Sequence, residues 1–269
     1  PIHIYGVALA GGNVITVPLG NDQKFLDTIA YVCEHLYPKP KLLILNYPHN
    51  PTSMTVEPGF FEPVVALAKR FNVAVIHDFA YGETTFDGYK PPSFLSAKGA
   101  KEVGVEVHSL SKGHNMIGWR IGFVVGHPKI VQAFADVKDN CDSGQFMAIQ
   151  HAAALALRTP DIPQRIRAKY RRRLEKLVAA LQQVGFRCQM PGGTYFLYTP
   201  APIAAGERRF ATAEEAAALA DAVDAARAGL EAAARAAFAA APVSRSTAAF
   251  HSALPDLRPF VLYRLPGLL

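Results

Sequence analysis

The sequence predicts an α/β protein whose central sheet is mostly parallel and covered by helices on both faces. Strand-like apolar runs alternate with amphipathic helical segments along the first half of the chain, an order typical of strand–helix–strand units. The runs at 41–46 and 73–76 are short and apolar, as expected when both faces of a sheet are buried, whereas valines alternate in the run at 103–107. Polar residues follow the strand ends, at the edge where parallel sheets bind their ligands. With 269 residues, the chain can build one large domain or two modest ones.

The elements of this sheet follow in order along the first half. The chain is expected to open with a strand and a loop, followed by an amphipathic helix over 25–36. A helix over 60–71 carries its apolar residues on one face. The expected strands after the opening one cover residues 41–46, 73–76, 103–107 and 121–125. The last two of these strands form a unit around a loop with two glycines, Gly113 and Gly118, which let backbone come close to a ligand.

Beyond Gly126 the pattern becomes helical. The expected helices cover residues 128–138, 145–157 and 162–184. Residues 186–198 then predict two strands around a Pro-Gly-Gly turn, the start of a smaller α/β domain. We therefore expect a large domain over 1–165, and an interdomain helix with a small domain over 166–269. Residues 201–269 are atypical, because 213–241 is very rich in alanine and the rest has little periodicity.

One amine, two hydroxyls and one guanidinium lie at the mouth of the last two-strand unit. Lys112, held between buried strands, can lose its proton and trap a carbonyl. The hydroxyls of Ser109 and Ser111 together with Arg120 suit a phosphate. An amine beside a phosphate site points to pyridoxal 5'-phosphate, held by the lysine as a Schiff base.

Two earlier strands deliver polar groups to the same edge. Asn50 follows the strand at 41–46 in a turn that two prolines fix, and Asp78 with Tyr81 follows the strand at 73–76. Any one of these residues could serve only as a helix cap or turn residue. Three successive strands delivering such groups to one edge indicate a single site.

The same residues also fit other interpretations. The string Ser109-x-x-Lys112 also fits the nucleophile motif of penicillin-recognising enzymes, but the Ser-Asp-Asn and Lys-Thr-Gly partners of that motif are absent. The spacing of the nearby histidines fits no metal site, so we expect them to lie on the surface or to support the site. Trp119 is expected to pack in the core.

Composition excludes several classes of protein. The formal net charge of +6 is spread out, and the basic cluster over 165–173 is typical of a solvated helix face, not of a nucleic-acid surface. No apolar run has the length of a membrane span, and the start shows no signal-peptide pattern. Cys33, Cys141 and Cys188 are few and lack metal or disulfide spacing, which indicates the reducing cytoplasm.

The constellation resembles the cofactor motifs of the class I/II, fold-type I aminotransferases over residues 1 to about 200. The motifs that carry the resemblance are Asn50-Pro51-Thr52, Asp78-x-x-Tyr81, Ser109-x-Ser111-Lys112, and Arg120 eight residues past the lysine. Within the family, NYPHNPTS, HDFAY, SLSKGHNMIGWRIGFVVG and VKDNCDSGQF most resemble the LL-diaminopimelate and the alanine (glutamate–pyruvate) aminotransferases.

The resemblance implies a role for each residue. Lys112 would form the Schiff base and then move a proton at the substrate α-carbon, while Asp78 would pair with the protonated pyridine nitrogen. Tyr81 and Asn50 would bind the phenolic oxygen of the ring. The two serines and the arginine of the motif would bind the phosphate. The implied reaction transfers an amino group between an amino acid and a 2-oxo acid in amino-acid biosynthesis, in a cytoplasmic homodimer.

The chain also departs from the family pattern. The family has a segment ahead of Pro1, with an arm, a phosphate-binding helix start and a ring-stacking aromatic, so we expect an N-terminally truncated fragment. Arg258 and Arg264 are stand-ins for the arginine that binds the substrate carboxylate. Two alternatives to the aminotransferase stay open: a C–S lyase with the same cofactor, and a truncated remnant without catalytic activity.

Overall fold

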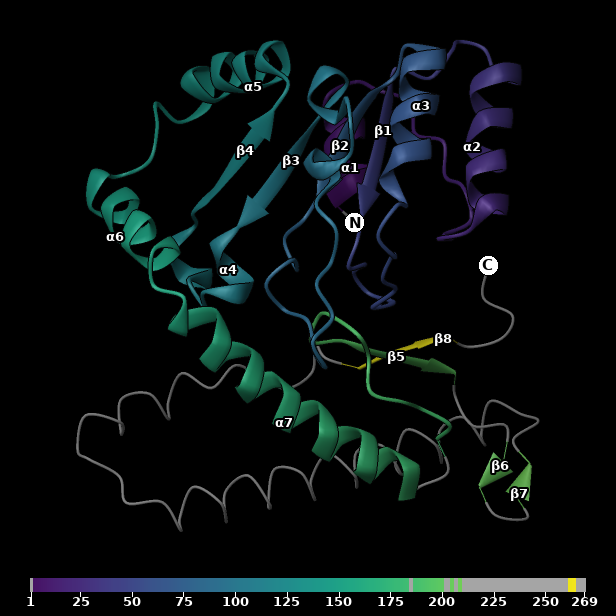
Figure 1. Ribbon diagram of the computed structural model, residues 1–269, viewed down its shortest axis with the longest axis vertical. Helices are drawn as coiled ribbons and strands as arrows, with labels where there is room; N and C mark the ends of the chain where they lie inside the picture. Colours follow the sequence, from purple (N-terminus) through teal and green to yellow (C-terminus); the bar gives the residue numbers. More distant parts are fainter. Residues whose placement is uncertain (1, 184–185, 201–203, 206–207, 210–260, 265–269) are drawn as a thin grey trace. The chain divides into compact units, whose positions relative to one another are not determined.

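The structure is a computed structural model, and it divides into two compact units (Figure 1). It describes residues 2–183, 186–200, 204–205, 208–209 and 261–264. The first unit comprises Pro1–Asn50, Met54–Arg167 and Gly192–Thr194. The second comprises Pro51–Ser53, Ala168–Pro191 and Tyr195–Leu269. The domain boundary expected between residues 165 and 166 stays a prediction.

The first unit is built on a four-stranded sheet in the order β1-β2-β3-β4. Its strands are β1 (Leu42–Asn46), β2 (Ala74–Asp78), β3 (Gly104–Ser109) and β4 (Gly122–Gly126). The first three strands are mutually parallel, and β4 runs antiparallel to β3. The predicted α/β class with a mostly parallel sheet is therefore confirmed, and each of the four strands lies within two residues of its expected bounds.

The register of the sheet places the site residues. Asn46 pairs with Asp78, and Asp78 pairs with Val107, so the carboxyl ends of β1, β2 and β3 lie at one edge. The three arrows point the same way in Figure 1. The chain segments that leave these strands therefore start side by side, although they are 30 or so residues apart in sequence.

Helices α2 (Gln23–His35) and α3 (Phe61–Phe71) pack beside β1 and β2 over the main core (Figure 1). The side chain of Asp22 caps α2 by accepting a hydrogen bond from the Phe25 amide at 3.0 Å. The helix α3 ends at Asn72, whose left-handed φ of 52° suits asparagine. The buried members of this core include Phe25, Ile29, Phe61, Val64, Val75 and Phe94.

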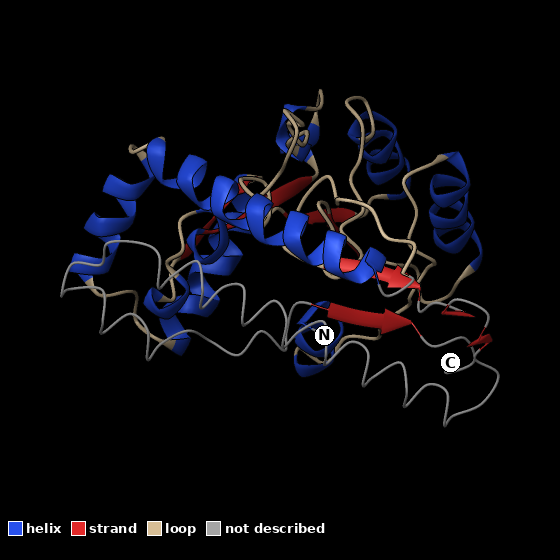
Figure 2. Ribbon diagram, turned by 90° about the horizontal axis from the view of Figure 1, so that it is seen from below, coloured by secondary structure: helices blue, strands red, loops and turns tan. Residues whose placement is uncertain are grey.

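Other helices that the structure describes are α4 (Leu110–Gly113), α5 (Pro128–Cys141), α6 (Met147–Leu157) and α7 (Asp161–Gln183), with short 3₁₀ helices at Phe94–Ser96, Ala100–Glu102 and Ile117–Trp119. Among them, α5, α6 and α7 match the three helices predicted beyond Gly126, whereas α4 and the 3₁₀ helices were not predicted. The long helix α7 is conspicuous in Figure 2. A second buried cluster joins α4 to α6 through Leu110, Met116, Ala153 and Ala156.

The expectation of a strand at the start of the chain is wrong. Ile2–Leu9 forms the helix α1, which ends where Gly12 N donates to the Val7 carbonyl at 2.9 Å. Apart from His3 the segment is largely apolar, so its sequence has no period that separates strand from helix. Its helical form carries His3 to the carboxyl end of β2.

In the second unit, the strand expected before Pro191 is also absent from the described residues. Residues 186–190 are irregular, because they hydrogen-bond to the end of α7 and not to a neighbouring strand. Phe186 N donates to the Leu181 carbonyl at 3.0 Å, and the Gln182 side chain donates to the Cys188 carbonyl at 2.9 Å. The strand after the turn is present as β5 (Leu197–Pro200), which pairs in parallel with β8 (Val261–Arg264). A short antiparallel pair joins β6 (Ala204–Ala205) to β7 (Arg208–Arg209).

Helices cover the sheet less completely near β4 than predicted. Val107, Phe123 and Val125 are each 37–39% exposed in the described chain. Trp119, expected in the core, is 48% exposed. The alanine-rich segment over 213–241 lies outside the described residues. None of the helices that the structure describes is long and apolar enough to cross a membrane.

Candidate active site

Asp78 ends β2 with an ionised carboxylate. Its Oδ1 accepts from the Ala80 amide at 3.1 Å, and its Oδ2 lies 2.9 Å from His3 Nε2. Burial raises the pKa of this carboxyl, but the hydrogen bonds from His3 and Ala80 and the nearby histidine charges outweigh burial and hold it below its usual value. A carboxylate that stays ionised can hold a proton on a cationic partner.

Sequence reasoning did not single out His3. It lies 75 residues before Asp78, and one histidine in an apolar segment carries no signal of its own. Only the helical form of α1 and the position of β2 bring the two together. His49 is close enough to His3 and Asp78 for both to affect its pKa. Burial and His3 lower the pKa of His49 to about 4, against an opposing effect of Asp78, so its imidazole is neutral near pH 7.

Lys112 and Tyr81 form the second part of the site. The Lys112 Nζ lies 5.7 Å from the centroid of the Tyr81 ring, within the range of a cation–π contact. Tyr81 is 3% exposed in the turn after β2, while Lys112 is half-buried in α4, directly after β3. Two of the three residues expected to be catalytic are therefore together, and Asp78 stands three residues before Tyr81.

The serines lie where the sequence places them, at the start of α4. Ser109 caps this short helix, its Oγ accepting from the Ser111 amide at 3.1 Å. Arg120 is exposed and donates from Nη1 to the Ile117 carbonyl at 3.1 Å. No hydrogen bond joins this guanidinium to either serine in the described part of the chain, so their joint role as a phosphate site stays a prediction.

Gly113 allows a close approach of the backbone to the chain after β2. A Cβ added at this glycine would lie 2.4 Å from the Cβ of Glu83. The contact holds α4 against that turn. It thereby helps to place Lys112 beside Tyr81. Gly118 has open space around it.

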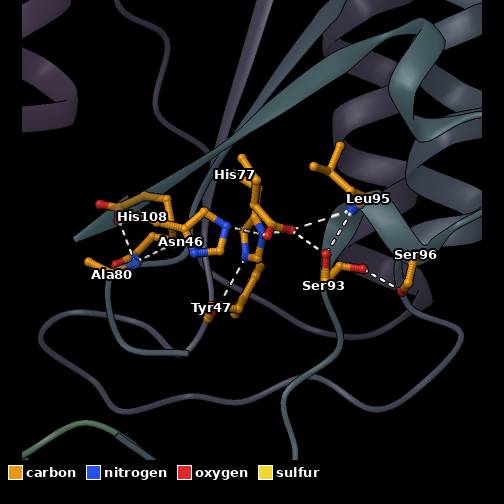
Figure 3. A network of polar contacts seen from close by, with 10 residues as sticks. Asn46, Tyr47, His77, Ala80, Ser93, Leu95, Ser96 and His108 are labelled. Atoms are coloured by element: carbon orange, nitrogen blue, oxygen red, sulfur yellow. Dashed lines mark hydrogen bonds and ion pairs between the residues drawn. The ribbon is translucent and has the colours of Figure 1, made fainter. Parts of the chain in front are cut away.

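A buried polar network crosses the strands behind Asp78 (Figure 3). The carboxylate of Glu106, 2% exposed, lies 2.8 Å from His108 Nε2 and 3.3 Å from His77 Nδ1, and accepts from the Ser93 hydroxyl at 2.7 Å. His77 Nε2 lies 3.0 Å from the Tyr47 carbonyl. The histidine that precedes Asp78 is thus fixed from both neighbouring strands. His77 is fully buried, so of the two locations expected for the histidines, on the surface or in support of the site, it has the second.

Glu106 should make stability sensitive to acid. Burial raises its pKa, but the hydrogen bonds from His108, His77 and Ser93 outweigh burial and hold the pKa well below the usual range. The folded-state pKa is therefore below the unfolded value of about 4.3. Glu106 consequently stabilises the fold above that pH, and this stabilisation is lost as the pH falls below it.

We expect Glu106→Gln to lower the free energy of unfolding by about 3–5 kcal/mol at pH 7, because a buried ion pair loses one partner. Urea unfolding at pH 7 and at pH 3–4 measures the effect, and the difference from the parent protein should narrow at the lower pH. Glu102→Gln is the matched control, since Glu102 pairs with Lys69 at the surface and should matter little. Equal effects of the two substitutions would contradict the importance of the network.

No metal centre is present among the described residues: no group of three or more histidine, cysteine, aspartate or glutamate side chains could hold an ion. Cys33 and Cys188 are buried and Cys141 is exposed, and all three are free thiols. The described site is therefore made of a carboxylate, an amine, a phenol and hydroxyls at the edge of a parallel sheet.

A mostly parallel sheet places Lys112 just past β3 and Asp78 at the end of the neighbouring strand β2, as the resemblance to the aminotransferases implied. The comparisons with known proteins agree. Residues 1–235 match the sequence profile of aminotransferase class I and II. The chain belongs to this family.

Particular relatives narrow the comparison. The chain is 49% identical over 205 residues to the LL-diaminopimelate aminotransferase of Methanocaldococcus jannaschii, covering 76% of this chain and 49% of that protein. It is 44% identical to the glutamate–pyruvate aminotransferase AlaC of Escherichia coli over 78% of this chain and 52% of that protein. The solved N-succinyldiaminopimelate aminotransferase of Mycobacterium tuberculosis superposes with a TM-score of 0.63 and 30% identity, covering 71% of this chain and 50% of that one.

Two conclusions follow from these identities and coverages. The fold is that of the fold-type I aminotransferases, as the resemblance implied. The chain spans about half the length of the curated relatives it matches.

Proposed function

We propose that this chain provides the cofactor-binding core of a pyridoxal phosphate-dependent aminotransferase, which moves an amino group between an amino acid and a 2-oxo acid. One observation carries the proposal. The Lys112 amine lies over the Tyr81 ring, beside the strand end that presents the ionised carboxylate of Asp78. An amine, a phenol and a carboxylate in this order are the groups that the pyridoxal ring needs.

The donor set fits the cofactor. Lys112 would bind its aldehyde carbon, and Asp78, held ionised by His3 and the Ala80 amide, would accept a hydrogen bond from its protonated ring nitrogen. Tyr81 and Asn50 would bind the phenolic oxygen. Ser109, Ser111 and Arg120 would take the phosphate. When bound, the cofactor supplies the electron sink for the negative charge that develops at the substrate α-carbon.

The residues of the chain account for proton transfer and orientation. Lys112 is the group that moves a proton at the substrate α-carbon, and its short helix is held in place by the close contact of Gly113 with Glu83. Asp78 keeps the ring nitrogen protonated because its own pKa is held low. Tyr81 is buried and therefore presents its hydroxyl from a fixed position.

The substrate proposal rests on the named relatives, which act on diaminopimelate-type, alanine-type or glutamate-type substrates by their names. We expect the protein expressed from its whole gene to use a small or acidic amino donor with 2-oxoglutarate as acceptor. A panel of amino donors, with 2-oxoglutarate present and glutamate measured, checks this. A preference for aromatic or branched-chain donors would contradict it.

Three measurements separate the aminotransferase from the two alternatives. Release of pyruvate from cystathionine without any 2-oxo acid would identify a C–S lyase. A protein that binds no pyridoxal phosphate, by absorbance and mass, would be a remnant without catalytic activity. Transfer of the amino group to 2-oxoglutarate with no pyruvate release is the result expected of the aminotransferase.

Three finer features belong to the same proposal. The protein is proposed to be cytoplasmic and a homodimer, as the resemblance implies, with amino acids and 2-oxo acids as its partners. Arg258 and Arg264 are the candidates for the arginine that binds the substrate carboxylate. Arg264 is the last residue of β8, where it pairs with Pro200, whereas Arg258 lies outside the described residues.

A further inference from the structure

The buried amide of Asn46 lies between two of the proposed cofactor-binding residues. Asn46 is the last residue of β1 and is 6% exposed. Its Oδ1 accepts a hydrogen bond from the backbone N–H of Asn50 at 2.8 Å. Its Nδ2 donates to the backbone carbonyl of Asp78 at 2.9 Å and to that of Pro48 at 3.3 Å. Figure 3 shows this amide beside the strand end. Both the oxygen and the nitrogen of this one amide are thus hydrogen-bonded.

These contacts fix the backbone at two points from which functional side chains emerge. The bond to Asn50 closes the turn after β1, and the bond to the Asp78 carbonyl ties that turn to the end of β2. Asn46 and Asp78 are also partners in the parallel register, so the amide reaches across the sheet with no change of strand geometry. A side chain can hold a position only as well as its own backbone is held.

We infer that Asn46 is a positioning residue, whose single amide sets the placement of Asn50 and Asp78 toward the cofactor at the same time. In this role Asn46 acts through Asn50 and Asp78 and not by contact with the cofactor or the substrate. This role rests on the proposed function, since it concerns the same site. No residue type other than asparagine offers an acceptor and a donor at this reach in so small a volume: aspartate lacks the donor, and glutamine is longer by one methylene.

The alternative is a purely structural role, in which Asn46 satisfies buried backbone groups and contributes only to stability. The two roles differ in whether the effect of substituting Asn46 depends on Asn50 and Asp78. A structural residue weakens cofactor binding by the same factor whether or not Asn50 and Asp78 are intact. A positioning residue has a smaller effect when the residue that it positions has already been removed.

The test is a set of double-mutant cycles on the dissociation constant of pyridoxal phosphate, measured by absorbance with the protein expressed from its whole gene. We expect Asn46→Ala to raise this constant about ten-fold in the parent protein, by disturbing two contacts. In an Asp78→Asn or an Asn50→Ala background, the increase should fall to about three-fold. Ser93→Ala is the matched control, because it removes a 2.7 Å bond to buried Glu106 and touches neither residue.

Asn46→Asp keeps the protein testable if the alanine variant does not fold. It preserves the acceptor for Asn50 N–H but places an oxygen near the Asp78 carbonyl. Its effect should therefore couple to Asp78→Asn and not to Asn50→Ala. Equal factors in all backgrounds, as expected for Ser93→Ala, would overturn the positioning role alone. A protein that takes up no pyridoxal phosphate would overturn this role together with the proposed function.

Discussion

Replacing Lys112 by alanine should abolish covalent attachment of pyridoxal phosphate and reduce amino transfer by about a thousand-fold or more. The lysine supplies both the amine that binds the cofactor and the base that moves the proton, and proton transfer alone contributes about 10²–10⁴-fold. Borohydride reduction of the protein expressed from its whole gene, followed by peptide mapping, measures the attachment directly.

The control for this prediction is Lys129→Ala. Lys129 is exposed in the first turn of α5, outside the proposed site, so its loss should leave both the borohydride tag and the rate unchanged. In the unsubstituted protein the tag should be found on Lys112. A tag on any other lysine would show that Lys112 does not have the proposed role.

Asp78→Asn should reduce the turnover number about a thousand-fold at saturating cofactor, while cofactor affinity falls only about ten- to a hundred-fold. The affinity loss corresponds to one charge-assisted hydrogen bond, about 1.5–3 kcal/mol. The rate loss is larger because an amide cannot keep the ring nitrogen protonated, and the protonated ring is what stabilises the developing negative charge.

Separate measurement of cofactor binding and of turnover distinguishes these two effects. Asp139→Asn is the control, because Asp139 is exposed on α5 and its substitution removes the same charge from the protein. A turnover number within a few-fold of the parent value in Asp78→Asn would contradict the role proposed for this carboxylate.

The positions of the proposed site residues were predictable because parallel strands carry a strong local signal. Short apolar runs mark β1, β2 and β3, and parallel pairing brings their carboxyl ends together. Asp78 is the last residue of β2, and Asn50 and Lys112 lie a few residues past the ends of β1 and β3. Their shared edge could therefore be inferred without any knowledge of the contacts between them.

The supporting residues were not predictable in the same way. Glu106 and His77 are adjacent only through the register of β2 and β3, and each alone is an ordinary polar residue in a strand. The role of Asn46 depends on the cross-strand distance to the Asp78 carbonyl. Such contacts depend on where atoms of distant segments lie relative to one another, which no residue pattern encodes.

The sequence by itself determined the α/β class, the order of the strands and which residues stand at their ends, because strand burial and turn chemistry are local properties. Only the tertiary structure decided that Ile2–Leu9 is a helix and that it brings His3 to within 2.9 Å of Asp78. The segment has no hydrophobic period that separates strand from helix, so its sequence alone did not decide between the two. The contact between His3 and Asp78 joins residues 75 positions apart, and it exists only after distant parts of the chain have folded together.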